Sequence, residues 1–122
     1  MNLAILNENN EICDAECPVS RASGILSGKW TTLIIRDLLS GKKRYSELAR
    51  SLAGISPRML AARLDMLCEA GLVAKTIYPT VPPKTEYELT AEGRRIEPVI
   101  AAMAEFGARL KSGGRARPQS RP

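Results

Sequence analysis

Histidine is missing from the 122-residue chain, and its absence removes the commonest general base and metal ligand of proteins. No serine has a basic partner to activate it, and no glycine-rich phosphate-binding loop is present. Three cysteines without a histidine do not form an ordinary structural zinc site. We therefore expect a protein that is not an enzyme and that needs neither a metal nor another cofactor.

Aromatic residues and long apolar runs are also scarce. One Trp, three Tyr and one Phe leave most of the core packing to aliphatic side chains. No apolar run approaches the ~20 residues of a membrane-spanning helix, and the first ten residues do not resemble a signal peptide. The odd number of cysteines argues against a disulfide framework. These features predict a cytoplasmic protein with no membrane partner and a single domain.

The net charge of +5 is distributed unevenly along the chain. Residues 1–16 contain four acidic side chains and no basic one, which predicts a flexible acidic arm. Residues 112–122 are rich in Gly, Pro and Arg, which predicts a disordered basic tail after a folded domain over residues 17–111. Within that domain, residues 42–63 hold six basic side chains and one acidic side chain, a pattern typical of polyanion binders.

Helical spacing and capping residues predict four helices, over about 18–27, 29–39, 45–52 and 57–70. The third helix is expected to turn Tyr45, Leu48, Ala49 and Leu52 inward. The fourth helix is the best defined, because Ser56 suits its N-cap, Pro57 its first turn and Gly71 its C-terminal end. The third and fourth helices, separated by a turn of about four residues, form a helix-turn-helix preceded by a short basic loop, 42–44.

The pattern then changes to strand over 72–78 and 85–89, joined by a proline-rich tip, 79–84. A final helix follows Thr90, with a bend near Glu97 because Pro98 removes one helical hydrogen bond. This order predicts a mainly α fold with a small β-hairpin wing, which is a winged helix-turn-helix.

Apolar side chains on the first and last helices supply material for a dimer interface. The residues expected there are Val19, Leu26, Ile96, Val99, Ile100, Met103, Phe106 and Leu110.

Three segments together resemble one protein family. They are CPVSRASGILSGKWTTLIIRDLLSGKKRYSELARSL, GISPRMLAARLDMLCEAGLV and YPTVPPKTEYELTAEGR, and they lie between residues 17 and about 106. The chain resembles the HxlR-type regulators, which are relatives of the MarR-type winged-helix transcription factors. The resemblance implies a homodimer, built from its first and last helices, that acts on palindromic operators in duplex DNA as a repressor or an activator.

In such a domain, the start of the fourth helix enters the major groove. Arg58 is placed to bind guanine O6 and N7, Ser56 to bind a phosphate, and Arg63 to contact a phosphate or a base at the groove edge. Met59 and Ala62 are expected against thymine methyl groups. The alternative is that both arginines are ordinary solvent-facing side chains.

Basic residues outside the fourth helix are expected at the DNA backbone. Lys42, Lys43 and Arg44 neutralise phosphates in this interpretation, and Lys84 lies in or beside the minor groove. The alternative for the wing is a rigid proline turn with no role in DNA binding.

Cys17 is the candidate redox-sensing residue. It stands at the N-cap of the first helix, where backbone amides and Arg21 favour a thiolate, although Asp14 and Glu16 oppose it. Several HxlR-type proteins with a cysteine at this place look like thiol-based sensors, so the resemblance implies an oxidant or an electrophile as effector, with another small molecule as a further option. Cys13 is a candidate resolving partner, and Cys17 of a second copy is the alternative. The competing interpretation is a reduced cysteine buried in the dimer interface.

Cys68 and Trp30 are interpreted as packing residues. A winged helix that only binds other proteins is the rival function, and the concentration of basic residues favours DNA over it. RNA is disfavoured because the chain lacks an exposed aromatic platform.

Overall fold

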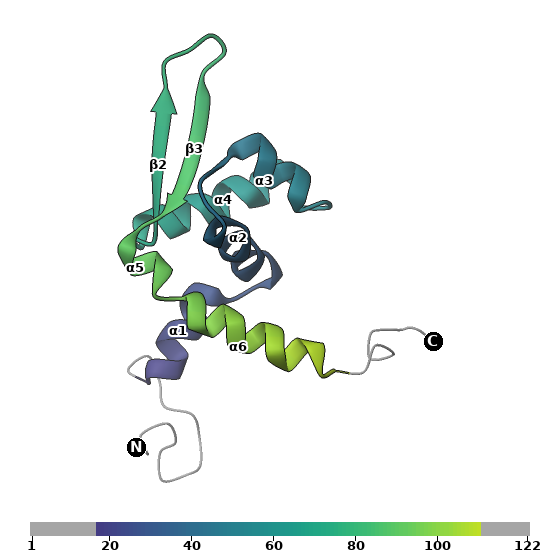
Figure 1. Ribbon diagram of the computed structural model, residues 1–122. Coiled ribbons are helices and arrows are strands. Elements are labelled where there is room, and N and C mark those ends of the chain that lie inside the picture. Colours follow the sequence, from purple (N-terminus) through teal and green to yellow (C-terminus); the bar gives the residue numbers. More distant parts are fainter. Residues whose placement is uncertain (1–16, 111–122) are drawn as a thin grey trace.

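The computed structural model describes residues 17–110, which form six helices and three strands (Figure 1). The helices are α1 (Pro18–Leu26), α2 (Lys29–Leu39), α3 (Tyr45–Ser51), α4 (Pro57–Glu69), α5 (Ala91–Arg94) and α6 (Glu97–Ala108). The strands are β1 (Lys43–Arg44), β2 (Val73–Tyr78) and β3 (Lys84–Leu89). The predicted mainly α fold with a β-hairpin wing is confirmed. None of the helices in residues 17–110 is long and apolar enough to cross a membrane.

The core lies where α2 meets α3, α4 and the base of the wing. Fully buried aliphatic side chains come from all three helices, and Tyr87 and Leu89 close the core from β3. The buried aliphatic residues of the helices are Ile34, Ile35, Leu38, Leu48, Leu60, Leu64 and Leu67. The prediction for Ala49 was wrong, because it is exposed while Leu48 fills the core side of α3. Burial of this aliphatic cluster is the main stabilising contribution to the domain.

The predicted helix-turn-helix is present as α3 and α4. Gly54, with a φ of 99°, lies in the turn between these helices, and Gly71, with a φ of 80°, follows α4. Both values fall in the left-handed region that glycine adopts at little cost. The chain therefore ends α4 sharply and turns directly into the wing.

The wing belongs to a three-stranded antiparallel sheet of order β1-β3-β2. Val73 pairs with Leu89 at the buried base, and Tyr78 pairs with Lys84 at the far end. The basic segment predicted as a loop includes β1, in which Lys43 pairs with Tyr87 and Arg44 with Glu86. Two residues are too few to show the alternating apolar and polar pattern by which a strand is predicted. The extended conformation of β1 is set by its pairing with β3.

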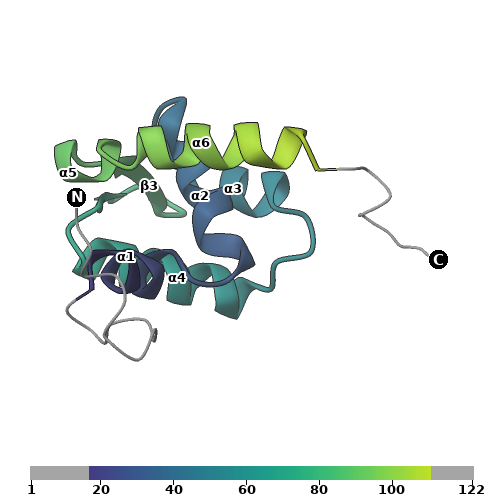
Figure 2. The same cartoon turned by 90° about the horizontal axis from the view of Figure 1, so that it is seen from below.

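The single final helix predicted after Thr90 is two helices. Thr90 caps α5 by accepting a hydrogen bond from the Gly93 amide at 3.0 Å, and Pro98 occupies the first turn of α6. Pro98 thus starts a new helix where a bend was predicted, which suits a residue without an amide proton. Figure 2 shows α6 crossing α2 as a long rod, against which α2 packs.

A glycine fixes the packing of α5 against the base of the wing. Gly93 is buried, and a Cβ atom at this position would collide with the backbone carbonyl of Leu72 and press on Leu89. The Thr90 amide also donates to the Leu72 carbonyl at 3.0 Å. The end of β3 and the start of α5 are therefore locked to the segment that follows α4.

Candidate nucleic-acid interface

The first turns of α4 present a small exposed face. The Ser56 side chain caps the helix by accepting the Met59 amide at 3.0 Å, and Pro57 occupies the first turn. Arg58 and Ala62 are exposed one helical turn apart, whereas Met59 is half-buried beside them. The opposite face holds the buried leucines of the core. The helix is thus anchored on one side and free to contact a partner on the other.

Arg63 is placed differently from Arg58. It is half-buried, and a Cβ atom on Gly28 would lie 3.2 Å from its Nη2 atom. Its Nε atom is buried and has no hydrogen-bond partner in the described part of the chain. The Arg63 side chain therefore lies against the junction of α1 and α2, while Arg58 extends into solvent.

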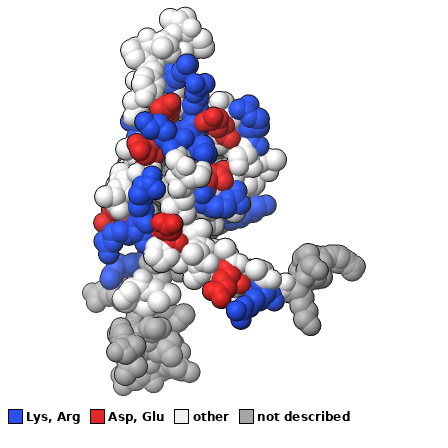
Figure 3. Space-filling view, viewed as in Figure 1, with Lys and Arg blue, Asp and Glu red and all other residues white. Residues whose placement is uncertain are grey.

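The basic segment before α3 lies beside the wing. Lys42 and Arg44 are exposed, and Lys43 is half-buried with its Nζ donating to Ser40 Oγ at 3.0 Å. The Arg44 amide donates to the Glu47 carboxylate at 2.8 Å, which holds the start of α3. Figure 3 shows basic side chains gathered on the wing and the adjoining helices, with a few acidic ones between them.

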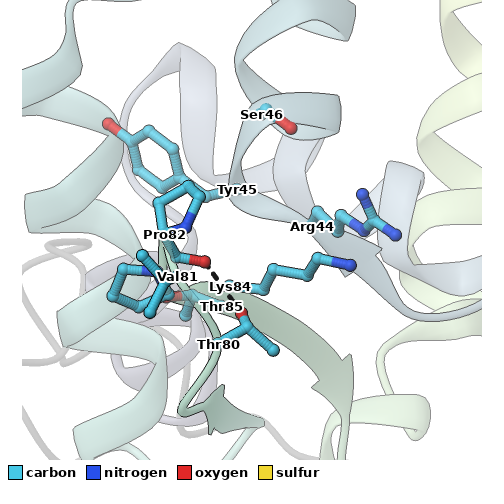
Figure 4. A pocket seen from close by; sticks show the side chains of 9 residues that line it. Arg44, Tyr45, Ser46, Thr80, Val81, Pro82, Lys84 and Thr85 are labelled. Carbon is cyan, nitrogen blue, oxygen red and sulfur yellow. Dashed lines mark hydrogen bonds between the residues drawn. The ribbon is translucent and has the colours of Figure 1, made fainter.

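A groove of about 660 Å³ separates the wing tip from the start of α3 (Figure 4). Arg44 and Ser46 line one side, and Thr80, Lys84 and Thr85 line the other. Lys84, predicted at the proline-rich tip, is the exposed first residue of β3. Sequence reasoning missed the three hydroxyl-bearing residues, because only the pairing of β1 with β3 brings Ser46 near the wing.

The cysteines occupy two environments. Cys17 is the N-cap of α1 and is 2% exposed, whereas Cys13 lies outside the described residues. Cys68 is half-buried against the core, as predicted, and this burial raises the pKa of its thiol although nearby Lys75 acts in the opposite direction. Within residues 17–110, no group of three His, Cys, Asp or Glu side chains is arranged to hold a metal.

Trp30 packs against the core, as predicted. Its ring approaches Gly54, and the Nζ atom of Lys29 lies 4.5 Å from the ring centroid.

The residues predicted for dimerisation lie along α1, α6 and the segment between α5 and α6. Leu26, Ile96 and Ile100 are half-buried against the core. The others are exposed: Val19 (54%), Val99 (44%), Met103 (48%), Phe106 (69%) and Leu110 (59%). Two mostly apolar hollows of about 250 and 290 Å³ adjoin α6, one beside α1 and one beside α2. The single chain thus leaves an apolar surface along α6 in contact with water.

Comparisons with known proteins give consistent results. The sequence model of the HxlR-like helix-turn-helix family matches residues 25–113. The HTH-type transcriptional regulator YdeP of Bacillus subtilis is 40% identical over 95 residues, which cover 78% of this chain and 74% of that protein. A MarR-family transcriptional regulator from Porphyromonas gingivalis has a similar solved structure, with a TM-score of 0.78, 44% identity and coverage of 83% of this chain and 99% of that chain. The redox regulator HypR in its oxidized form gives a TM-score of 0.74 at 38% identity, covering 79% of this chain and 99% of that chain.

Proposed function

This chain belongs to the HxlR-like helix-turn-helix family and is a DNA-binding transcriptional regulator, and we propose that it acts as a homodimer on palindromic operators. In this proposal α4 of each copy enters the major groove of one half-site. The compartment in which it acts is the cytoplasm.

The observation that carries this proposal is the exposed start of α4. Arg58 has the two-pronged donor that binds guanine O6 and N7, and Ala62 offers a methyl group to thymine one turn later. The Ser56 oxygen accepts the Met59 amide in the helix cap, and its O–H can still donate to a phosphate beside the backbone amides at the positive end of the helix. The contacts of Arg58 and Ala62 with bases select the operator sequence, and Met59 lies at the edge of the contact surface.

The surrounding basic residues supply affinity for any duplex. Lys42, Lys43, Arg44 and Lys84 contact phosphates, which positions α4 without reading bases. Arg63 reaches a phosphate only if its side chain leaves Gly28, so its contribution is smaller than that of Arg58.

The apolar surface along α6 supports the homodimer. A soluble monomer rarely keeps a contiguous apolar patch in water, and a two-fold axis would bury the same patch on both copies. Val19 of α1 joins Val99, Met103, Phe106 and Leu110 of α6 and its end in this interface.

The test is to incubate the reduced protein with sheared genomic DNA of its host and to sequence the bound fragments. We expect enrichment of a short inverted repeat with half-sites about one helical turn apart. Arg58→Ala should abolish the preference for one base pair in each half-site, whereas Arg94→Ala, on α5, serves as the matched control. Recovery of featureless DNA, with weak binding at every salt concentration, would instead support a protein-interaction module.

A second function, thiol-based sensing by Cys17, is favoured by the likeness to HypR, a redox regulator. Oxidation would join the Cys17 sulfur to Cys13, or to Cys17 of a second copy, and two protons and two electrons would pass to the oxidant. An electrophile would instead form an adduct on the Cys17 sulfur. Either change at the N-cap of α1 alters a helix assigned here to the dimer interface.

Operator affinity before and after peroxide or diamide treatment tests this second function. We expect oxidation to change the affinity of the wild type and of a Cys68→Ser control but not that of Cys17→Ser. Cys13→Ser distinguishes the two disulfides, because it blocks only the bond within one chain. An unchanged response in Cys17→Ser would refute Cys17 as the sensor and leave a reduced structural cysteine.

A further inference from the structure

The tip of the wing, residues 79–83, is exposed and uncharged, and it carries an apolar side chain. Residues 76–83 contain no acidic or basic side chain, and Val81 is 99% exposed. In Figure 3 this tip is white, directly above basic side chains. A single exposed valine is ordinary on a protein surface, so its significance depends on how the chain supports it and on what lies beside it.

The tip is held in a defined shape. Prolines at 79, 82 and 83 restrict the backbone on both sides of Val81. The Thr80 hydroxyl donates to the Pro82 carbonyl at 2.8 Å, and the Thr80 amide donates to the Tyr78 carbonyl at 2.8 Å. Because the tip is already ordered, Val81 loses little conformational entropy when it is inserted into a partner.

The groove beside the tip has the chemistry of a phosphate-binding channel. Its lining includes the cations Arg44 and Lys84 and no acidic residue. Both side chains extend toward the same side in Figure 4. Ser46 and Thr85 add hydroxyl groups, which can donate to phosphate oxygens as Arg and Lys do, whereas the Thr80 hydroxyl is donated to the Pro82 carbonyl.

An acidic residue, Glu86, lines an adjoining hollow of about 220 Å³ together with Arg44, Thr80 and Lys84. Glu86 pairs with Arg44 across the strands, and its carboxylate accepts a hydrogen bond from the Tyr78 hydroxyl at 3.0 Å. Arg44 and Lys84 form no ion pair among the described residues, so both cations remain available to an anion.

The length of the wing is of the same order as the spacing of DNA grooves. Lys75 pairs with the buried Tyr87, and three residues further along β2 Tyr78 pairs with Lys84, which corresponds to about 10 Å of strand. The five-residue tip, 79–83, extends beyond this last pair. Neighbouring major and minor grooves lie about half a helical turn apart, on the order of 17 Å. A tip that projects this far beside α4 reaches the minor groove next to the major groove that α4 occupies.

We infer that the groove between the wing tip and α3 holds one sugar–phosphate strand, and that Val81 and Pro82 enter the adjoining minor groove as an apolar wedge. This inference rests on the proposed binding of α4 in the major groove. Apolar wedges in the minor groove partly unstack a base step and bend the duplex, so they favour flexible steps. The wing therefore selects sequence outside the half-sites that α4 reads.

The wedge is tested with the full chain and the operator fragment recovered from genomic DNA, labelled with a fluorophore at each end. We expect Val81→Ala to reduce the bend measured by energy transfer, and to weaken binding about tenfold, because two apolar carbons leave the contact. Ile77→Ala is the matched control, since Ile77 is an exposed apolar wing residue outside the groove. Selection from a library with randomised flanks should show a flanking preference for the wild type that Val81→Ala lacks.

The channel is tested by the salt dependence of the same binding reaction. Arg44→Gln and Lys84→Gln should each lower the slope of log K against log salt by about one, and Arg94→Gln should leave it unchanged. If Arg58→Ala loses base preference while Val81→Ala matches Ile77→Ala, the wedge is wrong and the proposed function stands. If the wild type selects no operator at all, the proposed function fails as well. A Val81→Ala variant with normal bending but reduced capture of a protein would overturn the wedge in favour of a protein-binding tip.

Discussion

Some residues of α4 face solvent and others pack against the rest of the chain. Arg58 and Arg63 are one example of each. Helical spacing from the buried leucines places Arg58 on the far face of α4 and Arg63 at the edge of that face, and in the structure Arg58 is exposed and Arg63 is half-buried. The spacing does not specify where a long boundary side chain extends. The guanidinium of Arg63 lies against Gly28 because the α1–α2 junction crosses that side of α4, a tertiary contact absent from the local pattern.

The two arginines should therefore fail in different assays. Arg58→Ala should weaken operator binding by about 1–3 kcal/mol and leave the thermal midpoint unchanged. Arg63→Ala should lower the midpoint by roughly 4–8 °C, because about 1 kcal/mol of packing is lost, with a smaller effect on affinity. Calorimetry and fluorescence titration of both variants measure the difference. Equal affinity losses and equal midpoints for the two would contradict the assignment of Arg63 to packing.

Cys68 connects stability to alkaline pH. Burial raises the pKa of its thiol above the ordinary value of 9.0, and burial also raises that of Tyr87 above 10.0. Each neutral group stabilises the folded state fully below its unfolded pKa, and this contribution is lost as the pH rises through the folded pKa. Urea unfolding of the wild type from about pH 8 to 11 should show a free energy of unfolding that decreases above pH 9. In Cys68→Ala and Cys68→Ser, the decrease just above pH 9 should be smaller. Parallel curves for wild type and variants would show that Cys68 does not cause it.

At the scale of elements, the parts with strong local signals were predictable and the parts that depend on neighbours were not. The bounds of α2 and α4 follow from caps and from leucines at helical spacing, and both agree with the structure to within a residue. Strand β1 was missed because Lys43 and Arg44 become a strand only through their pairing with β3. The break before α6 was predicted as a bend, because sequence shows that Pro98 interrupts a helix but not how far the chain turns there.

The N-cap of α4 is an element whose contribution can be isolated. Ser56→Ala removes the acceptor of the Met59 amide and should cost about 1 kcal/mol of the free energy of unfolding. Ser51→Ala, at the exposed end of α3, is the matched control and should have little effect. Chemical denaturation of both variants gives the comparison, and equal stabilities would mean that water replaces the cap without loss.

At the scale of the molecule, residues 17–110 have two distinct sides, a basic side at the wing and an apolar side along α6. Figure 1 shows the wing and α6 projecting from different sides of the core, so DNA and a second copy can be bound together. Of the residues predicted for the α6 side, Leu26, Ile96 and Ile100 pack partly against the core. The groove between the wing tip and α3 was not predicted, because it exists only once the sheet is assembled.

Charge on α6 should separate the two copies. Phe106→Glu places a carboxylate in the proposed interface and should yield a monomer in light scattering after gel filtration, with operator affinity reduced at least about a hundredfold. Ala101→Glu adds the same charge on the opposite side of α6 and should remain dimeric. A dimeric Phe106→Glu variant, or a monomeric wild type, would contradict the interface.

The close approach of Gly93 to the Leu72 carbonyl limits which substitutions the gene can tolerate at this position. If every codon of the gene were randomised and the functional survivors sequenced, position 93 should return glycine alone, because even one methyl group would force the base of the wing away from α5. Gly24 of α1, where an added methyl group would meet no atom of the same chain within 4 Å, should accept more replacements than Gly93 in the same survivors. The evolution of this regulator is thus restricted at position 93 by the space that a side chain would need.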